Sequence, residues 1–182
     1  ADEIRNYYHT DVALTPGFRF DAVVPQGDPI TLENLYRYLP VPATLAKGNI
    51  TGRNLRALFE KELSSAFSAD AFQHEGGWFL GISGLDLQVD LDRADGQRVV
   101  SMHRATDQTE VLMDEVLSVA SCVRPFDKPG VLCSGEGFTD VEPLLDPGGA
   151  ELTPLQFLRK RLEGGPPQRR TGHVSDLSHT PV

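Results

Sequence analysis

Segments with two different hydrophobic periods alternate along this chain, and that mixture restricts its fold more than any other feature. Apolar residues recur at helical spacing over 31–39, 52–67 and 153–163, and a threonine stands at or just before the start of each segment. Strand-like alternation with a period of two runs through 85–91, and a matching apolar segment covers 98–104. The mixture predicts an α+β fold, a single domain with a mixed β-sheet flanked by helices.

The remaining regular elements are expected in the first two-thirds of the chain. Residues 1–9 are typical of the end of a helix, and further apolar segments are expected to be strands at 11–14, 43–50, 78–82 and 116–123. We expect the domain to cover residues 1–163. Few large apolar residues follow, so residues 164–182 are predicted to be a tail that is ordered only where it docks.

The composition argues against two classes of partner. With 40% hydrophobic and 24% charged residues, the chain of 182 residues has the make-up of a globular protein. Its net charge of -9 argues against a nucleic-acid surface, which needs clustered positive charge. No apolar run approaches the length of a membrane span. We therefore expect neither nucleic acid nor a membrane as a partner.

A candidate anion-binding residue follows the first predicted strand. The apolar segment 12–14 runs into a turn with Pro16 and Gly17, and the turn delivers Arg19 between two phenylalanines. Arginine offers five donors in a planar fork and keeps its charge when partly buried. That suits the capture of an anionic substrate group. The alternative is a structural arginine paired with a carboxylate such as Asp21 or Asp28.

Several motifs together carry a family resemblance. They are PGFR (16–19), ITLENLYRYLP (30–40), ITGRNLRALFE (50–60), SGLDLQVD (83–90) and DGQRVVSM (95–102). In this order they resemble the C-terminal domain of the 5'-nucleotidase family over about two-thirds of the chain. Within that family, TPGFRF is more similar to the SoxB-type thiosulfohydrolases of bacterial sulfur oxidation than to the nucleotidases.

The chain departs from the nucleotidases where they clamp a base between two aromatic rings. The resemblance places Val41 and Arg124 at these two positions, with Phe126 two residues further on. A valine and an arginine cannot supply a base sandwich. The resemblance then implies a substrate with a sulfonate-like head, a cysteine S-thiosulfonate on a sulfur-carrier protein. The substrate-binding residues that it implies are Gly17, Phe18, Arg19, Val41 and Arg124.

The resemblance places the reaction's metals outside this chain. None of the five histidines stands in a metal-binding motif. The family holds two metal ions, expected here to be manganese or zinc, in an N-terminal metallophosphoesterase-like domain. We therefore expect this chain to be a fragment of an exported or periplasmic hydrolase, to pair with that domain, to bind no cofactor and to be inactive alone. The alternatives are a nucleotidase or phosphoesterase domain and a non-catalytic binding module.

Two cysteines remain to be explained. Cys122 and Cys133 flank a segment with Pro125, Pro129 and Gly130, and that segment can close as a disulfide. The other interpretation is two unpaired thiols, one of them buried in a strand. Without a CxxC pattern the pair does not make a zinc site.

Overall fold

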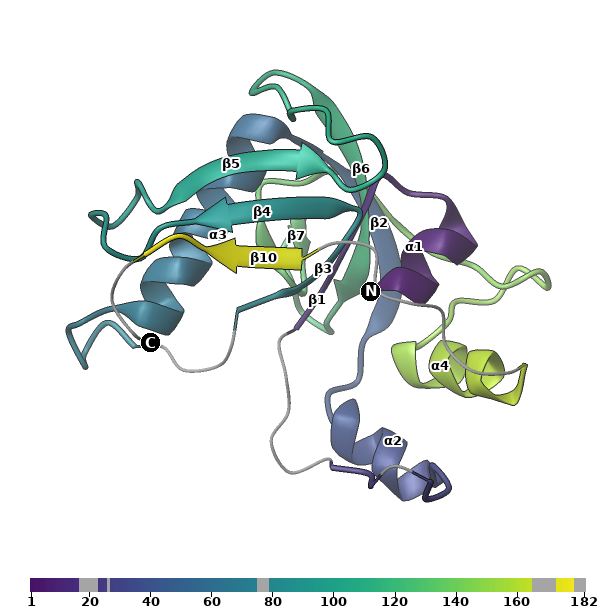
Figure 1. Cartoon of the computed structure of the whole chain (residues 1–182). Helices are drawn as coiled ribbons and strands as arrows, with labels where there is room; N and C mark the ends of the chain where they lie inside the picture. The colour runs from purple at the N-terminus through teal and green to yellow at the C-terminus, as the bar shows by residue number, and fades with distance from the viewer. Residues whose placement is uncertain (17–22, 26, 75–78, 165–172, 179–182) are drawn as a thin grey trace.

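The chain folds around two β-sheets, as the computed structural model shows (Figure 1). The structure describes residues 1–16, 23–25, 27–74, 79–164 and 173–178. The helices among them are α1 (Asp2–Tyr8), α2 (Leu32–Tyr38), α3 (Gly52–Phe67) and α4 (Pro154–Glu163). The strands are β1 (Val12–Thr15), β2 (Thr44–Thr51), β3 (Gly81–Ser83), β4 (Leu85–Val89), β5 (Val99–Arg104), β6 (Val116–Val123), β7 (Val131–Leu132), β8 (Gly135–Glu136), β9 (Thr139–Pro143) and β10 (His173–Asp176).

Both larger sheets are mixed. The first has five strands in the order β3-β1-β6-β2-β9, and β1 runs parallel to β6 while its other pairs are antiparallel. The second has the order β10-β4-β5, with β10 parallel to β4. A short pair, β7 and β8, completes the strands that the structure describes. The predicted fold class, α+β with a mixed sheet flanked by helices, is confirmed.

The longest ladder joins β2 to β6 at the middle of the five-stranded sheet. It runs without a break from Thr44 opposite Val123 to Thr51 opposite Val116. Alternate residues of these strands face opposite sides, so Leu45 and Ala120 enter one core while Ile50 and Val119 enter the other. The sheet therefore has an apolar surface on both faces.

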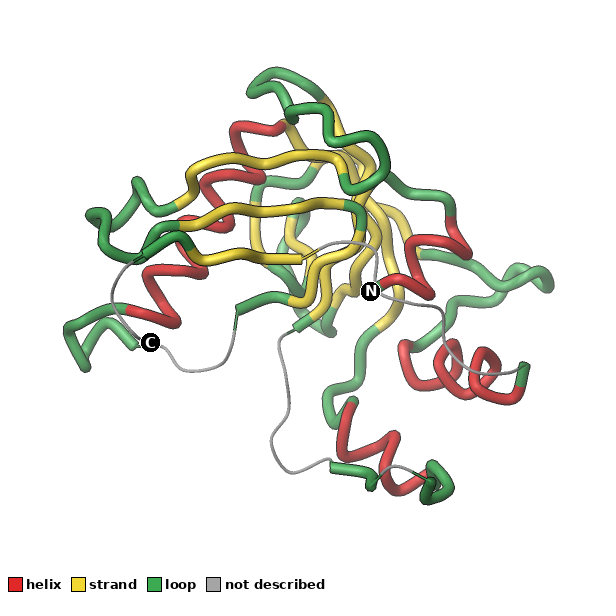
Figure 2. Tube along the Cα trace, in the orientation of Figure 1, coloured by secondary structure: helices red, strands yellow, loops and turns green. Residues whose placement is uncertain are grey.

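Helices cover both of these faces (Figure 2). On one face, Ile4 of α1 and Phe157 of α4 pack with Leu45 and Ala120. On the other, α3 and the β4–β5 sheet enclose the larger core, in which Phe59 is fully buried. The molecule is thus layered, with the five-stranded sheet between two hydrophobic cores.

Helix α3 is fixed to the second sheet by polar bonds that the sequence pattern did not indicate. The buried carboxylate of Glu60 accepts hydrogen bonds from the backbone N–H groups of Arg98 (3.0 Å) and Val99 (2.7 Å). Arg56, one turn earlier, donates to the carbonyl of Val99. A buried carboxylate needs such donors to offset its desolvation. The helix therefore holds the start of β5 as well as packing on it.

Gly84 forms the junction between the two sheets. It separates β3 from β4 and has φ of 89°, a left-handed conformation that favours glycine. A Cβ here would also overlap the carbonyl oxygen of Asp11. The chain can therefore pass from one sheet to the other at this point only because the residue has no side chain.

Some predicted elements differ from the observed ones. The strand expected at 78–82 is β3, which begins at Gly81, and Trp78 lies outside the described residues. Strands β7, β8 and β9 were not predicted, and β9 ends at Pro143 on the edge of its sheet, where proline is tolerated. In the predicted tail, residues 173–176 dock as β10 on β4. The domain boundary at residue 163 stays a prediction.

An ionic cluster ties the first strand to residues far along the chain. The carboxylate of Asp11 accepts hydrogen bonds from Ser118 N (2.9 Å), Ser118 Oγ (2.7 Å) and Arg104 (3.2 Å), and Arg104 also pairs with Glu115. Burial by itself raises the pKa of Asp11, but the bonds from Ser118 and Arg104 outweigh it and hold the pKa below its ordinary value. The ionised form of Asp11 therefore stabilises the fold.

We expect Asp11→Asn to lower the free energy of unfolding at pH 7 by about 1–2 kcal/mol, a range reduced because the group is partly exposed. A lowered pKa gives stability that is present above the unfolded value of about 4 and is lost as pH falls below it. The difference between wild type and variant should therefore shrink between pH 5 and pH 3. Urea unfolding across this range measures it, with Asp114→Asn, in an exposed ion pair, as control. A difference that does not change with pH would contradict the assignment.

The core face of α3 gives a second prediction. Leu58→Ala or Phe59→Ala should lower the free energy of unfolding by about 2–5 kcal/mol, because each empties a buried position. Leu112→Ala, at an exposed leucine, should change it by less than about 0.5 kcal/mol. Chemical unfolding of the three variants measures these changes. Equal losses of unfolding free energy at all three sites would be inconsistent with this core.

Candidate functional site

A hollow of about 520 Å³ lies at the end of the five-stranded sheet where β6 ends and β2 begins. This volume is in the range of small-molecule sites. Its walls come from four regions of the chain: Pro42, Ala43, Thr44 and Ala46; Val123, Arg124 and Pro125; Val141, Glu142 and Pro143; and Glu151 and Thr153.

Strand register brings these regions together. Thr44 lies opposite Val123 in the β2–β6 ladder, and Ala46 lies opposite Pro143 in the β2–β9 pair. Leu45 N donates to Leu152 O at 2.7 Å, which holds the start of α4 beside the sheet. The hollow is therefore a product of the strand pairing and does not depend on one loop.

Arg124 is the cationic group of this hollow. Its backbone N–H and its Nε both donate to Oδ2 of Asp127, at 2.8 Å and 3.3 Å. Asp127 N donates back to Arg124 O at 3.1 Å, which closes a turn. The guanidinium is half-exposed, and the terminal nitrogens take no part in these bonds. The turn fixes the base of the side chain beside the hollow.

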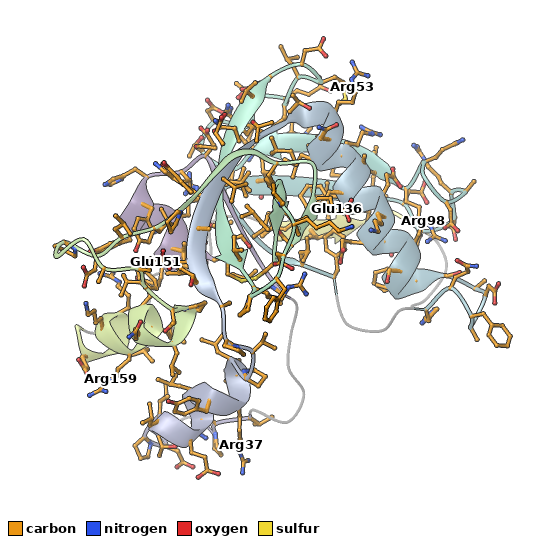
Figure 3. All side chains as sticks on the ribbon, turned by 180° about the vertical axis from the view of Figure 1, so that it is seen from behind. Arg37, Arg53, Arg98, Glu136, Glu151 and Arg159 are labelled. Atoms are coloured by element: carbon orange, nitrogen blue, oxygen red, sulfur yellow. A yellow bond between two sulfur atoms is a disulfide. The ribbon has the colours of Figure 1, made fainter. Side chains whose placement is uncertain are left out.

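Carboxylates and hydroxyls also line the hollow. Glu142 pairs with Lys47 at 3.0 Å, so its charge is balanced. Glu151, labelled in Figure 3, lies before α4. Thr153 caps α4, since its Oγ1 accepts from Gln156 N at 3.1 Å. The site combines one guanidinium, hydroxyls, apolar walls and two carboxylates, of which Glu142 is paired with Lys47. The guanidinium is the group in it that suits a small anion.

Two of the predicted substrate-binding residues lie in or next to the hollow, and the others lie outside the described residues. Arg124 lines the hollow, and Val41 is half-exposed immediately before the lining residue Pro42. Gly17, Phe18 and Arg19 lie outside the described residues, so their role stays a prediction.

Some lining residues were not identified from the sequence. Thr44, Glu142 and Glu151 join the site only through strand pairing and the start of α4. Thr153 was recognised as a helix cap alone. No local motif marks these positions, because they are far apart in the chain.

The two cysteines form a disulfide in the structure, which was one of the two interpretations of the sequence. Cys122, at the end of β6, is bonded to Cys133, and their Cα atoms are 5.1 Å apart, within the usual range. Cys133 N also donates to Cys122 O at 2.6 Å. The covalent loop contains Arg124 and Asp127, so it closes one wall of the hollow.

The residues that the structure describes show neither a metal site nor a membrane-spanning helix. Those residues contain no group of three or more His, Cys, Asp or Glu side chains placed to hold a metal ion. Nor does any described helix have the length and apolar character needed to cross a membrane.

Comparison with known families decides the relationship. The family model of the 5'-nucleotidase C-terminal domain matches residues 1–122, about two-thirds of the chain. The chain belongs to the 5'-nucleotidase C-terminal domain family. The match ends at Cys122, so the rest of the disulfide loop with Arg124, strands β7 to β9 and helix α4 follow the matched residues. No curated protein matches the chain by sequence.

Solved structures show this domain within longer chains. The 5'-nucleotidase precursor of Thermus thermophilus has 27% identity and a TM-score of 0.55, over 66% of this chain and 24% of that one. The sulfate thiohydrolase SoxB of Thermus thermophilus has 20% identity and a TM-score of 0.69, over 95% and 30%. The NAD nucleotidase of Haemophilus influenzae has 18% identity and a TM-score of 0.51, over 67% and 22%. The likenesses at 20% and 18% show the fold alone.

Removal of the disulfide tests its contribution to this 5'-nucleotidase C-terminal domain. The double variant Cys122→Ala, Cys133→Ala should lower the free energy of unfolding by about 3 kcal/mol, because the unfolded chain regains the entropy that loop closure removed. Chemical unfolding measures this change, with reduced wild type as the comparison. Two titratable thiols in the denatured, unreduced protein would show that the bond does not form.

Proposed function

We propose that this domain binds and positions the substrate of a SoxB-type thiosulfohydrolase, which removes sulfate from a cysteine S-thiosulfonate on a sulfur-carrier protein. In this reaction a water oxygen bonds to the sulfonate sulfur, the bond between that sulfur and the neighbouring outer sulfur breaks, and sulfate leaves. One proton of the water goes to the outer sulfur and the other to solvent. The carrier cysteine keeps the outer sulfur as a persulfide. The parent protein would be exported or periplasmic.

The observation that carries the proposal is the chemistry of the hollow. None of the lining residues that the structure describes is aromatic, whereas Arg124 supplies a half-exposed guanidinium. Base recognition relies on stacking against aromatic faces. A sulfonate needs donors and positive charge, and arginine provides both. Arg124 therefore favours an anionic head group, and the described lining residues offer no ring on which a base could stack.

The metal ions of such an enzyme do not fit the residues of this chain that the structure describes. The described residues offer no cluster of metal ligands, so we assign the manganese or zinc pair to an N-terminal metallophosphoesterase-like domain outside the chain. The contribution of this domain is to hold the substrate in position. Arg124, together with Arg19, would bind the anionic head.

A nucleotidase or related phosphoesterase is the second candidate, and a specific observation supports it. Phe126 stands two residues after Arg124, is fully exposed, and has φ of 73°, which is uncommon for a bulky residue. An exposed ring held in this way could stack on a base. The nucleotidase precursor of Thermus thermophilus is also the more similar in sequence, at 27% identity.

The deciding experiment uses the full-length parent protein with bound metal. Sulfate release from a cysteine S-thiosulfonate peptide is compared with phosphate release from adenosine monophosphate. Arg124→Ala should raise KM for the thiosulfonate about 10- to 100-fold, the usual effect of losing one charged hydrogen-bonding group. The 182-residue chain alone should hydrolyse neither substrate.

Arg93→Ala is a matched control for Arg124→Ala. Both arginines have side chains 49% exposed, and both pair through Nε with an aspartate three residues away. Arg93 does not line the hollow. An equal effect of the two substitutions would remove Arg124 from the site. Preferential turnover of the nucleotide, abolished by Phe126→Ala, would establish the second candidate, and no turnover of either substrate would favour a binding module.

A further inference from the structure

The segment 27–42 around helix α2, here called the α2 arm, exposes an unusual amount of apolar surface. Within α2, which is described in full, Leu35 is the buried residue. Other large apolar side chains of the arm are exposed to between 39% and 56%: Ile30 (54%), Leu32 (50%), Tyr36 (56%), Tyr38 (39%) and Val41 (49%). Several large apolar side chains exposed within one short segment favour an interaction site.

The sequence pattern of this helix predicts a buried face that the structure does not provide. Leu32, Leu35 and Tyr36 have the spacing of one helical face, yet two of the three are half-exposed. By contrast, the equivalent face of α3 is buried at Leu55, Phe59 and Leu63. The apolar face of α2 is therefore suited to pack against a surface that the described residues do not provide.

Local interactions do not explain why α2 is ordered. The helix has seven residues, and isolated helices of that length are unstable in water. A capping box between Thr31 and Asn34 and an exposed ion pair between Glu33 and Arg37 add only small stabilisation. Tertiary packing is what normally stabilises such a helix.

The position of the arm indicates what covers it. In Figures 1 and 2, α2 lies apart from both sheets and beside α4. In Figure 3, Arg37 of α2 lies at the end of the molecule away from the sheets. The arm leads directly into the hollow, because Val41 is followed by the lining residues Pro42 and Ala43. A body seated on the arm would therefore reach the rim of the hollow.

We infer that the α2 arm is the docking surface for the metal-binding catalytic domain of the parent protein. The inference rests on the proposed function, in which the reacting group must sit between this hollow and the metal ions. The solved relatives leave ample chain for such a domain, since this chain spans only 22–30% of the three compared above. The apolar face and the substrate hollow then form one continuous surface toward that domain.

Thiol labelling tests this inference directly. The native cysteines are joined in a disulfide, so Leu32→Cys introduces a single reactive thiol. We expect its labelling to be at least tenfold slower in the full-length parent than in the 182-residue chain. Leu112→Cys is the matched control: it replaces a leucine 65% exposed, close to Asp114, whose partner Arg53 lies at the opposite end of the molecule from Arg37 (Figure 3). Its labelling should be equal in both proteins.

A second pair of variants gives a readout that does not use cysteine. Leu32→Ser with Tyr36→Ser should lower the Tm of the 182-residue chain only slightly, because both side chains are half-exposed. In the parent it should lower the Tm of this domain and weaken substrate turnover. Leu112→Ser should do neither.

The other outcomes overturn either the inference or the proposed substrate. The catalytic domain does not cover the α2 arm if Leu32→Cys is labelled equally in both proteins. The same holds if the gene encodes no further domain. Protection that rises with the concentration of the isolated chain identifies a second copy, and protection only on adding the carrier identifies that protein. An unprotected arm in an active thiosulfohydrolase would sink this inference alone, whereas a protected arm in a parent without that activity would sink only the proposed substrate.

Discussion

The pairing of β2 with β6 is the constraint on which the rest of the molecule depends. This ladder fixes the middle of the five-stranded sheet and gives both cores their central side chains. Its register also places the start of β2 beside the end of β6, so Thr44 meets Val123 and the hollow forms between them. A shift of one residue would exchange the two faces of β2 and remove the site along with both cores. Fold and binding surface therefore share one determinant.

Local chemistry made much of the fold predictable. Thr31, Thr51 and Thr153 each accept a hydrogen bond from the third residue of the helix that follows, as their sequence context indicates. The sequence did not indicate features whose role depends on contacts with distant parts of the chain. Strand β9 has little apolar pattern because it is an edge strand, and the carboxylate of Glu60 looks like a solvated helix residue until the start of β5 is placed against it.

The candidate site was less predictable than the fold. Arg124 was found through a family position, and the family resemblance also indicated where an aromatic pair should have been. The acidic and hydroxyl walls come from β9 and from the start of α4, and no sequence motif joins them to Arg124. Amphipathic spacing predicted a buried face for α2, and the structure shows that face exposed. That disagreement is informative, because it marks a surface whose complement lies elsewhere.

The placement of β1 affects how the chain reaches this structure during synthesis. Strand β1 lies between β3 and β6, and the bond from Asp11 to Ser118 spans 107 positions. At about 5–20 residues per second, the apolar segment Val12–Leu14 waits on the order of 5 to 20 seconds for its neighbour β6 to be made. Its antiparallel neighbour β3 is made earlier, but until β6 appears the second edge of β1 has no partner. The first strand of this domain is therefore completed on both edges only late in the synthesis of the domain.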